Sequence, residues 1–542
     1  MNKSTPRKFL AAALLSRQKD IGFYNRAELI AACPDPGMVD DKKSALVLEQ
    51  MFSALPAATA AQTGPALNRP MTRLTARQID MAHRQAQVWL EQKVFVLPRD
   101  QLGLCGKTQK MVPPVFFAWG VRTELDLPRA AVLNSRKPRR ISPEDRWLKV
   151  TKAMIGQAAD KGLVMLTSLG NYQYEIAAFF ALEAGTRQVI ICDGPLPLML
   201  PEKKREQFFC DYGDLFSPER TTLISPFSPG PLPPVRQRRP YRDACLTALA
   251  GEILAAEIRS QGNMEHLIKE ALRRGAEVKV FCPSRFDRAA QGNKKLLELG
   301  ARPWKELSKP GPGFKTMIRQ KKKTIALQAR DFLSDLEDGA NLIHFTRSCP
   351  GPWPGQTPAE YYRALTSGRS GAAHTAFDTL RRILDQGRIR GGSGLTRGRA
   401  PVVSFTAGGL DELSSLVRWR PGLIRWTFEP YGLAVTRAAL QGLGAAPVVY
   451  GGDDIWEKMP DGQKFRFQLH QPPKTDWSGE KEWRLEGDVD LGKISKKDIK
   501  IIVPSREEAR KIASEYGLRV VLAKGLNQKY EGWRKRQAGR AE

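Results

Sequence analysis

The sequence has few cysteines and histidines, and it lacks long hydrophobic runs. Its seven Cys residues are scattered, odd in number and never form a CxxC pair, which argues against a disulfide framework and a zinc site. No apolar run approaches the roughly 20 residues that cross a bilayer. The basic and apolar start, residues 3–15, is not followed by a small-residue cleavage site. We therefore expect a cytosolic protein without a membrane span or a metal.

Acidic residues are in the minority. The chain has 86 Lys and Arg against 57 Asp and Glu, a formal net charge of +29. A field of this sign attracts polyanions and raises their local concentration. We expect nucleic acid or a nucleotide as partner, the alternative being a charged surface that only keeps the protein in solution. The sequence leaves open whether the chain forms a homo-oligomer.

The chain of 542 residues is long enough for two to four domains. Residues 1–110 are predicted to form a mostly helical leader. In residues 111–305 short apolar strands alternate with amphipathic helices, which is typical of βαβ units and a parallel sheet. Residues 306–335 are predicted to be a basic linker, and residues 336–542 an α+β domain. The expected fold class is therefore α/β, with a Rossmann-like parallel sheet between a helical leader and a C-terminal α+β domain.

Parallel strands end at one edge of their sheet, where such folds bind ligands. The strands expected in the middle region are 130–133, 163–167, 188–192, 221–225, 251–258 and 278–282, with helices near 145–160, 172–184, 262–274 and 292–299. Four loops would then surround one cleft, at 134–137, 167–171, 193–195 and 259–263. In the last region we expect strands at 402–406, 431–435, 447–450, 464–469, 482–485 and 499–503, and helices at 376–386 and 506–516.

A series of short motifs runs through residues 113–301. In chain order they are PPVFF from Pro113, NSRKP from Asn134, RDA from Arg242, Glu257, RSQGN from Arg259, and the pairs Gly292-Asn293, Leu296-Leu297 and Gly300-Ala301. This ordered series resembles the DNA-processing A (DprA) family, and the resemblance implies a Rossmann-like domain that binds single-stranded DNA. Two departures keep a nucleotide ligand open. Asn134 stands where glycine is usual, and the family's Ser-Gly-x-Ala-x-Gly-Ile-Asp helix start is replaced at 167–174.

The expected cleft contains donors and cations suited to an anion. Hydroxyl and backbone N–H groups at a strand-to-helix turn bind phosphate, and arginine forks add charge and geometry. The alternative is that these arginines form a solvated rim. The predicted nucleic-acid or nucleotide-binding residues are Ser135, Arg136, Lys137, Arg239, Arg242, Arg259 and Asn263.

Two short motifs mark the last region, His344-Phe345-Thr346 at its start and Glu482-Trp483-Arg484 near its end. This layout resembles AbiGi-type phage-resistance proteins and, more distantly, the DNA-targeting ADP-ribosyltransferase toxins (DarT). The resemblance implies that the His-x-Thr motif binds NAD and that the late strand glutamate is catalytic. The predicted catalytic residues are His344, Thr346 and Glu482, and the cofactor-binding residues are Tyr431, with Trp426 as its alternative, and Arg484, which would hold a phosphate. The alternative is a core histidine and a surface Glu–Arg pair.

Two functions follow. The first is a DprA-like nucleic-acid or nucleotide-binding protein with a C-terminal effector in anti-phage defence, an NAD-dependent ADP-ribosyltransferase or NAD-cleaving enzyme. The second is a non-enzymatic single-stranded-DNA-binding protein that protects or delivers DNA. A metabolic nucleotide enzyme is less favoured, because the glycine pattern is altered. Toxicity on expression that Glu482→Ala removes would separate the first from the second.

Overall fold

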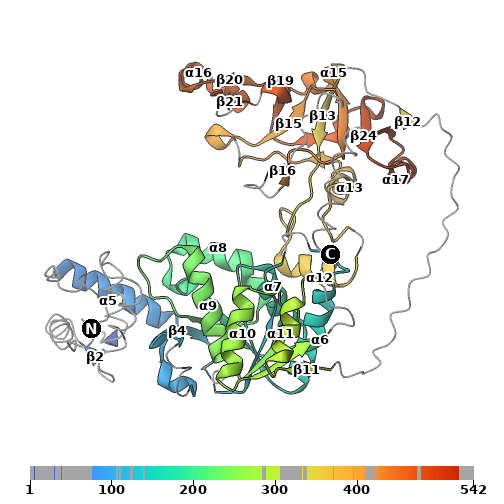
Figure 1. Cartoon of the computed structure of the whole chain (residues 1–542). Coiled ribbons are helices and arrows are strands. Elements are labelled where there is room, and N and C mark those ends of the chain that lie inside the picture. Colours follow the sequence, from blue (N-terminus) through green and yellow to red (C-terminus); the bar gives the residue numbers. More distant parts are fainter. Residues whose placement is uncertain are drawn as a thin grey trace. The chain divides into compact units, whose positions relative to one another are not determined.

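The computed structural model of the chain contains two compact units (Figure 1), each of which is described by itself. Unit 1 comprises Met1–Lys309 and Pro354–Gly368, and unit 2 comprises Pro310–Trp353 and Arg369–Glu542. The structure describes residues 5–6, 30, 38–39, 76–104, 108, 111–122, 126–137, 141–282, 288–305, 332–333, 339–369, 371–394, 396–409, 419–420, 425–472, 476 and 478–523. Most of the predicted leader and linker therefore lies outside the described residues.

A nine-stranded, mostly parallel sheet forms the centre of unit 1. Its strand order is β11-β10-β9-β5-β6-β7-β8-β4-β3, with β4 and β3 antiparallel at one end. The strands are β3 (Phe95–Pro98), β4 (Val115–Gly120), β5 (Arg129–Leu133), β6 (Val164–Ser168), β7 (Gln188–Ile191), β8 (Thr221–Ser225), β9 (Glu252–Ala255), β10 (Glu277–Phe281) and β11 (Arg302–Trp304). This order confirms the expected Rossmann-like fold class, because the chain winds outward from β5 in both directions.

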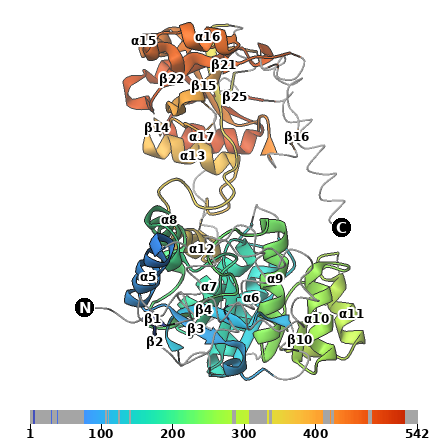
Figure 2. The same ribbon diagram turned by 90° about the vertical axis from the view of Figure 1, so that its left-hand side faces the viewer.

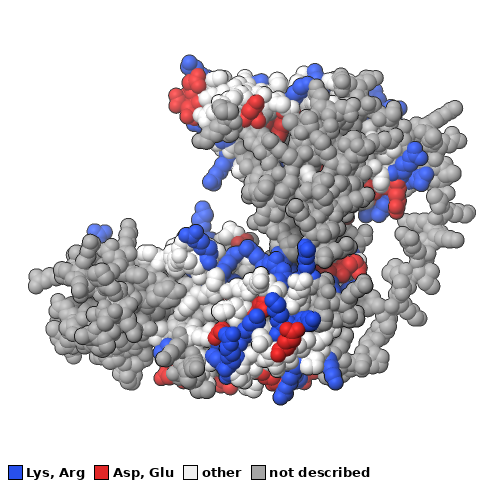
Figure 3. All heavy atoms as spheres, viewed as in Figure 1, with Lys and Arg blue, Asp and Glu red and all other residues white. Residues whose placement is uncertain are grey.

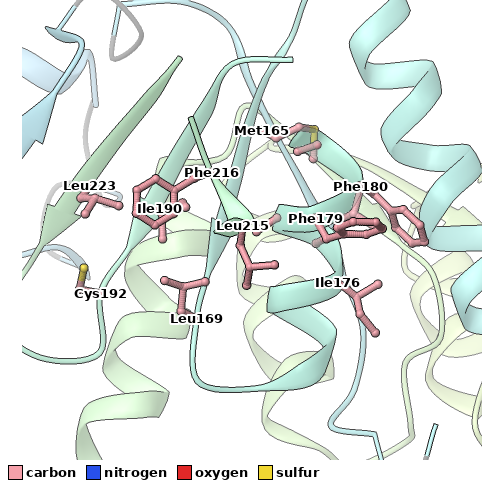
Figure 4. Close-up of a cluster of buried hydrophobic side chains, with 14 of the residues drawn as sticks. Met165, Leu169, Ile176, Phe179, Phe180, Ile190, Cys192, Leu215, Phe216 and Leu223 are labelled. Carbon is pink, nitrogen blue, oxygen red and sulfur yellow. The ribbon is translucent and has the colours of Figure 1, made fainter. Parts of the chain in front are cut away.

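Helices cover both faces of this sheet. They are α5 (Ala76–Glu91), α6 (Arg146–Asp160), α7 (Tyr172–Glu183), α8 (Glu202–Tyr212), α9 (Val235–Leu249), α10 (Asn263–Arg273) and α11 (Gln291–Glu298). Side chains alternate along a strand, so Val132 of β5 packs with α6 and α7, whereas Leu133 packs with α9, α10 and α11. Figure 4 shows the first of these cores, which includes Met165 and Ile190 of the sheet and Phe179 of α7.

One further helix, α12 (Pro358–Thr366), reaches unit 1 from within the region predicted as the C-terminal domain. A capping box between Thr357 and Glu360 begins it, which satisfies two backbone N–H groups at its N-terminus. Tyr362 and Leu365 are fully buried, and the Tyr362 hydroxyl donates to Glu175 of α7. The segment 354–368 is therefore part of the unit 1 core.

Unit 2 is built on an eight-stranded mixed sheet of order β12-β25-β24-β18-β13-β15-β22-β19. Its strands are β12 (Phe332–Leu333), β13 (Asn341–Phe345), β15 (Val402–Thr406), β18 (Gly432–Thr436), β19 (Ala446–Pro447), β22 (Glu482–Glu486), β24 (Ile499–Val503) and β25 (Arg519–Leu522). Helices α13 (Ala376–Gln386) and α17 (Arg506–Tyr516) pack on the core through Leu380 and Ile512. They lie beside each other (Figure 2), joined by an Arg381–Glu515 ion pair of 3.1 Å.

The smaller elements of unit 2 are pairs of short strands and short helices. They are β14 (Arg388–Ile389) with β23 (Val489–Asp490), β16 (Trp419–Arg420) with β17 (Arg425–Trp426), β20 (Val449–Gly451) with β21 (Phe467–Leu469), α15 (Arg437–Gly442), α16 (Asp453–Lys458) and the 3-10 helix η9 (Asp461–Arg466). The predicted strand at 464–469 is thus wrong in its first half, where the chain is a 3-10 helix. The predicted strand at 447–450 is in fact split between β19 and β20.

Candidate functional site

The switch point of the unit 1 sheet lies between β5 and β9, which are neighbours in space but far apart in sequence. The two loops that follow these strands are tied together. Ser135 N donates to Glu257 O over 2.9 Å, and Arg259 N donates to Ser135 Oγ over 2.8 Å. Asn134 adds a third link, since its Oδ1 accepts from Glu257 N and its Nδ2 donates to Thr151. The asparagine that replaces the usual glycine is thus a buried bridge between the loops.

Three of the predicted binding residues are exposed at this edge. Arg136 follows β5, Arg259 follows β9, and Asn263 begins α10. Neither arginine side chain has a hydrogen bond or ion pair with any residue that the structure describes. Their guanidinium groups are therefore available to an anionic ligand. In Figure 3 Lys and Arg side chains also spread over the part of unit 1 that carries α8, α9 and α10, with acidic ones among them.

Lys137 lies at the same edge but is committed to the protein. Its Nζ is 2.6 Å from Glu257 Oε2, and Arg146 Nε is 2.6 Å from Glu257 Oε1. Burial lowers the pKa of Lys137, although the nearby Glu257 carboxylate opposes this shift. An external phosphate would have to compete with Glu257 for this ammonium group.

Two of the predicted binding residues, Arg239 and Arg242, lie on α9 and differ in their exposure. Arg239 is 31% exposed and bridges two loops at the strand ends, with its Nε 3.1 Å from Asp193 Oδ2 and its Nη1 donating to Asn171. Arg242 is fully buried. It donates to Asp243 and to Leu169 O, so the prediction that it contacts a ligand phosphate is wrong. The physical reason is the phase of α9, which turns Arg242 inward to stack on a buried tyrosine 4.7 Å away.

Unit 2 contains a cavity of about 500 Å³, within the size range of small-molecule sites. Its wall includes both His344 of β13 and Glu482 of β22. These strands flank β15, and the pairs Ile343↔Thr406 and Thr406↔Glu482 set their register. Two residues that are 138 positions apart are thereby brought to one cavity. The polar side chains on the wall are those of His344, Arg347, Thr396, Ser404, Thr406, Thr427, Gln468, Glu480, Glu482, Arg484 and Arg390.

His344 is held as a neutral hydrogen-bond acceptor. Its Nδ1 is 2.9 Å from Ser404 O, and because a carbonyl only accepts, Nδ1 carries the proton and Nε2 keeps its lone pair. Burial lowers the pKa of His344 to about 4. The ring is therefore uncharged near neutral pH, and Nε2 can accept from a ligand hydroxyl.

Glu482 is fixed by Arg484, two residues along the same strand. Arg484 Nε donates to Glu482 Oε1 over 2.9 Å, and Nη2 donates to Oε2 over 3.1 Å. Each carboxylate oxygen retains a second lone pair. Arg484 itself is only 3% exposed, and its remaining N–H groups donate to Phe465 O, Phe467 O and Gln468 Oε1. The expectation that Arg484 holds a ligand phosphate is therefore wrong, since all five N–H donors are used within the protein.

The other two predicted residues of unit 2 lie away from the cavity wall. Thr346 is buried and donates to Ala376 O over 2.8 Å, which ties the end of β13 to the start of α13. Tyr431 donates to Glu508 Oε1 over 3.0 Å. The alternative aromatic, Trp426, does line the cavity. An aromatic contact with a ligand ring thus falls to Trp426 rather than Tyr431.

The sequence patterns predicted only three of the polar residues on this wall, and Arg390 and Gln468 are among those that they missed. Arg390 is exposed there and has no ion pair with any described residue, and Gln468 contributes a carboxamide. A signal for Arg390 was present, because it lies in the segment Gly-Arg-Ile-Arg-Gly-Gly at 387–392, directly after α13. Glycine lets a loop approach a ligand closely, and an arginine in such a loop is a candidate phosphate contact.

The described residues contain no group of three or more His, Cys, Asp or Glu side chains that could hold a metal ion. Among the helices of this part of the chain, none is both long and apolar enough to cross a bilayer.

The chain matches no family model and no curated protein. It is similar to the solved structure of DNA processing protein A (DprA) from Streptococcus pneumoniae, with 18% identity and a TM-score of 0.34, over 52% of this chain and 95% of that chain. A structure that describes the single-stranded DNA binding mode of DprA from Helicobacter pylori matches with 17% identity and a TM-score of 0.30, over 39% and 90%. The molybdenum cofactor binding protein from Rippkaea orientalis matches with 14% identity and a TM-score of 0.21, over 33% and 88%. Similarity at this level assigns no ligand or activity.

Proposed function

We propose that unit 1 is a DprA-like module that binds single-stranded DNA, or a nucleotide, at the switch-point edge of its sheet. The observation that supports this best is the pair of exposed arginines, Arg136 and Arg259, on the two loops that meet there. The net charge of +29 adds a long-range attraction for a polyanion. Backbone phosphates would bind these guanidinium groups without regard to sequence.

The test is binding of a fluorescent oligothymidine to the full chain at increasing salt. Binding through phosphates releases condensed counterions, so affinity should fall steeply as salt rises. An affinity that does not change between low and moderate salt would contradict the proposal. A nucleotide that competes with the oligonucleotide would identify the alternative ligand.

For unit 2 we propose an NAD-using effector, an ADP-ribosyltransferase or NAD-cleaving activity. The observation that favours it is that His344 and Glu482, chosen from distant motifs, line one cavity. His344 Nε2 would accept from a ribose hydroxyl and orient the substrate. Glu482 would stabilise the positive charge that develops on the sugar as the bond to nicotinamide breaks and the electron pair leaves with nicotinamide. Arg390 would take a phosphate, and Trp426 would contact the nicotinamide ring.

The sugar carbon then forms its new bond to water or to a nucleophile of another molecule, and the proton that this nucleophile loses passes to the solvent. Release of nicotinamide from NAD by the full chain, with and without single-stranded DNA, tests this activity. Ser514→Ala is the control for Glu482→Ala, because Ser514 is exposed on α17 and donates only to Lys511 O of its own helix. Lack of NAD consumption under every condition would refute the proposed enzymatic activity of unit 2.

Together the two units would act in anti-phage defence, unit 1 as the part that detects nucleic acid and unit 2 as the toxic part. Expression of the chain should then slow growth, and Glu482→Ala should relieve this. If the chain binds single-stranded DNA but neither consumes NAD nor affects growth, the alternative holds, a non-enzymatic protein that protects or delivers DNA.

A further inference from the structure

Arg484 joins two side chains on the wall of the unit 2 cavity. Its Nη2 donates to Glu482 Oε2 over 3.1 Å and to Gln468 Oε1 over 2.6 Å. Glu482 and Gln468 both line the cavity, and they come from different elements, β22 and β21. The position of one polar group relative to the other is thus set by a single guanidinium.

The orientation of the Gln468 carboxamide follows from chemistry. A guanidinium donates and never accepts, so the Gln468 atom that faces Arg484 must be the oxygen. The amide nitrogen, Nε2, then points elsewhere, and it has no hydrogen bond with any residue that the structure describes. Two lining residues of the cavity thus differ in what they can offer a ligand: Glu482 has a carboxylate acceptor, and Gln468 has an amide donor that no described residue occupies.

We propose that Arg484 is a positioning residue that sets Glu482 and Gln468 as an acceptor and donor pair, and that Gln468 Nε2 donates to a ribose hydroxyl oxygen of the substrate. This inference rests on the NAD activity proposed for unit 2. Adjacent ribose hydroxyls match such a pair, because one can donate to the carboxylate while the other accepts from the amide. Arg484 acts through these two side chains, because all five of its own N–H groups donate within the protein.

The role differs in its kinetics from the phosphate contact that the sequence predicted for Arg484. A phosphate contact is made equally in the ground state and the transition state, so its loss raises KM and leaves kcat unchanged. Misplacement of Glu482 lowers kcat, because the carboxylate acts as charge develops on the sugar. Loss of the Gln468 donor weakens binding of the intact substrate.

The experiment compares Arg484→Lys and Gln468→Ala with the wild-type full chain. Lysine keeps the positive charge but cannot form the two-pronged contact. Arg466→Lys is the matched control. Arg466 lies two residues before Gln468 and donates to Pro447 O over 3.0 Å, but it does not line the cavity. The readouts are kcat and KM for nicotinamide release, the Kd of NAD by calorimetry, and the thermal unfolding midpoint.

We expect Arg484→Lys to lower kcat by about 10-fold or more with a Kd within about 2-fold, as for a group that acts only in the transition state. Gln468→Ala should raise the Kd of NAD by about 3-fold to 10-fold, the size of one hydrogen bond. Arg466→Lys should change neither value. An Arg484→Lys chain with normal kcat and a raised Kd overturns the positioning role, and an unchanged Kd in Gln468→Ala overturns the donor role.

The failure of this inference is distinguishable from failure of the proposed activity. If the wild type neither binds nor consumes NAD, the activity falls and the substrate role of Gln468 falls with it. The contact between Arg484 and Glu482 can then be tested without NAD, by a double-mutant cycle of Arg484→Lys and Glu482→Gln that measures the thermal unfolding midpoint. Additive midpoint shifts would overturn it, and strong non-additivity would support it. Should Arg484→Lys fail to fold, Gln468→Ala still tests the donor role.

Discussion

Units 1 and 2 each bury one arginine that the sequence patterns assigned to a ligand. In unit 1 it is Arg242 on α9, and in unit 2 it is Arg484 on β22. The arginines that remain accessible, Arg136, Arg259 and Arg390, all follow or precede a regular element in a loop. A regular element has a fixed phase that turns part of its side chains into the core, whereas a loop can leave a cation in solvent.

The units also differ in how they build a candidate site. The parallel strands of unit 1 end at one edge of the sheet, so its site is made of loops that the strand pattern already locates. The cavity of unit 2 is lined by residues of β13, β15 and β22 together with loop residues such as Arg347 and Arg390. Its strand part therefore depends on which strands are neighbours and in which register. Five predictions test and sharpen this contrast, in order of decreasing effect.

The largest effect should come from Arg242→Ala in unit 1. Removing one partner of a buried ion pair typically costs about 3–5 kcal/mol, and here Asp243 and Leu169 O would both lose a donor. The free energy of unfolding by urea measures this loss. Arg136→Ala, on the exposed loop, should stay within about 0.5 kcal/mol of the wild type. Equal stabilities for the two variants would show that Arg242 does not hold the core.

In unit 2 the largest effect should be on the rate. Glu482→Ala should lower nicotinamide release by about 10²-fold or more, because it removes a group that acts in the transition state. His344→Ala should mainly raise the Kd of NAD, since this residue orients the substrate. The two variants, assayed side by side, separate rate from binding. Full activity of the Glu482→Ala chain would show that Glu482 does not act in the reaction.

The loop arginines of unit 1 should control the salt dependence of DNA binding. Loss of one phosphate contact reduces the slope of log K against log salt by about 0.7 for a single strand. Arg136→Ala combined with Arg259→Ala should therefore reduce it by about 1.4 and weaken binding to every sequence alike. Fluorescence anisotropy measures this, with Lys149→Ala, an exposed lysine of α6 paired to Glu144, as control. A slope that is unchanged in the double variant would place the DNA elsewhere.

The unfolding midpoint of the chain should depend on pH through His344. Its folded pKa of about 4 lies below the ordinary value, so between these values the unfolded state binds the proton more readily. The His344 contribution to stability is thus complete above pH of about 6.5 and is lost as pH falls toward about 4. The midpoint of the wild type should fall more than that of His344→Gln over this range. Parallel curves for the two proteins would show that His344 is not held neutral by burial.

The smallest effect should come from Tyr431→Phe. The change removes the hydroxyl that donates to Glu508 on α17 and should cost about 1 kcal/mol, the usual net value of one hydrogen bond. The Kd of NAD should not change, because Tyr431 is not on the cavity wall. Trp426→Ala should weaken NAD binding instead. A raised Kd of NAD in Tyr431→Phe would show that Tyr431 takes part in NAD binding.

Several elements of the fold were predictable from local pattern. The bounds of β8, β15, β24, α13 and α17 agree with the ranges expected from the sequence. These segments have either a buried run of β-branched residues or a strong helical period with a cap, so nearest neighbours in sequence decide their structure. Helices α8, α9 and α12 were not among the expected ranges. The buried face of α12 has its partners in α7, nearly 200 residues earlier.

The sequence by itself determined the sheet type of unit 1, the edge at which its loops gather, and the basic charge that favours a polyanion. It did not determine which arginines are free, because that depends on how α9 is turned against the sheet and on which carbonyl groups surround Arg484. The sequence motifs also marked His344 and Glu482 as candidate site residues, but they did not show that the two residues lie in one site. Only the pairing of β13 and β22 with β15 brings these side chains to one cavity, since strand neighbours and register are fixed by burial of the whole sheet rather than by either motif.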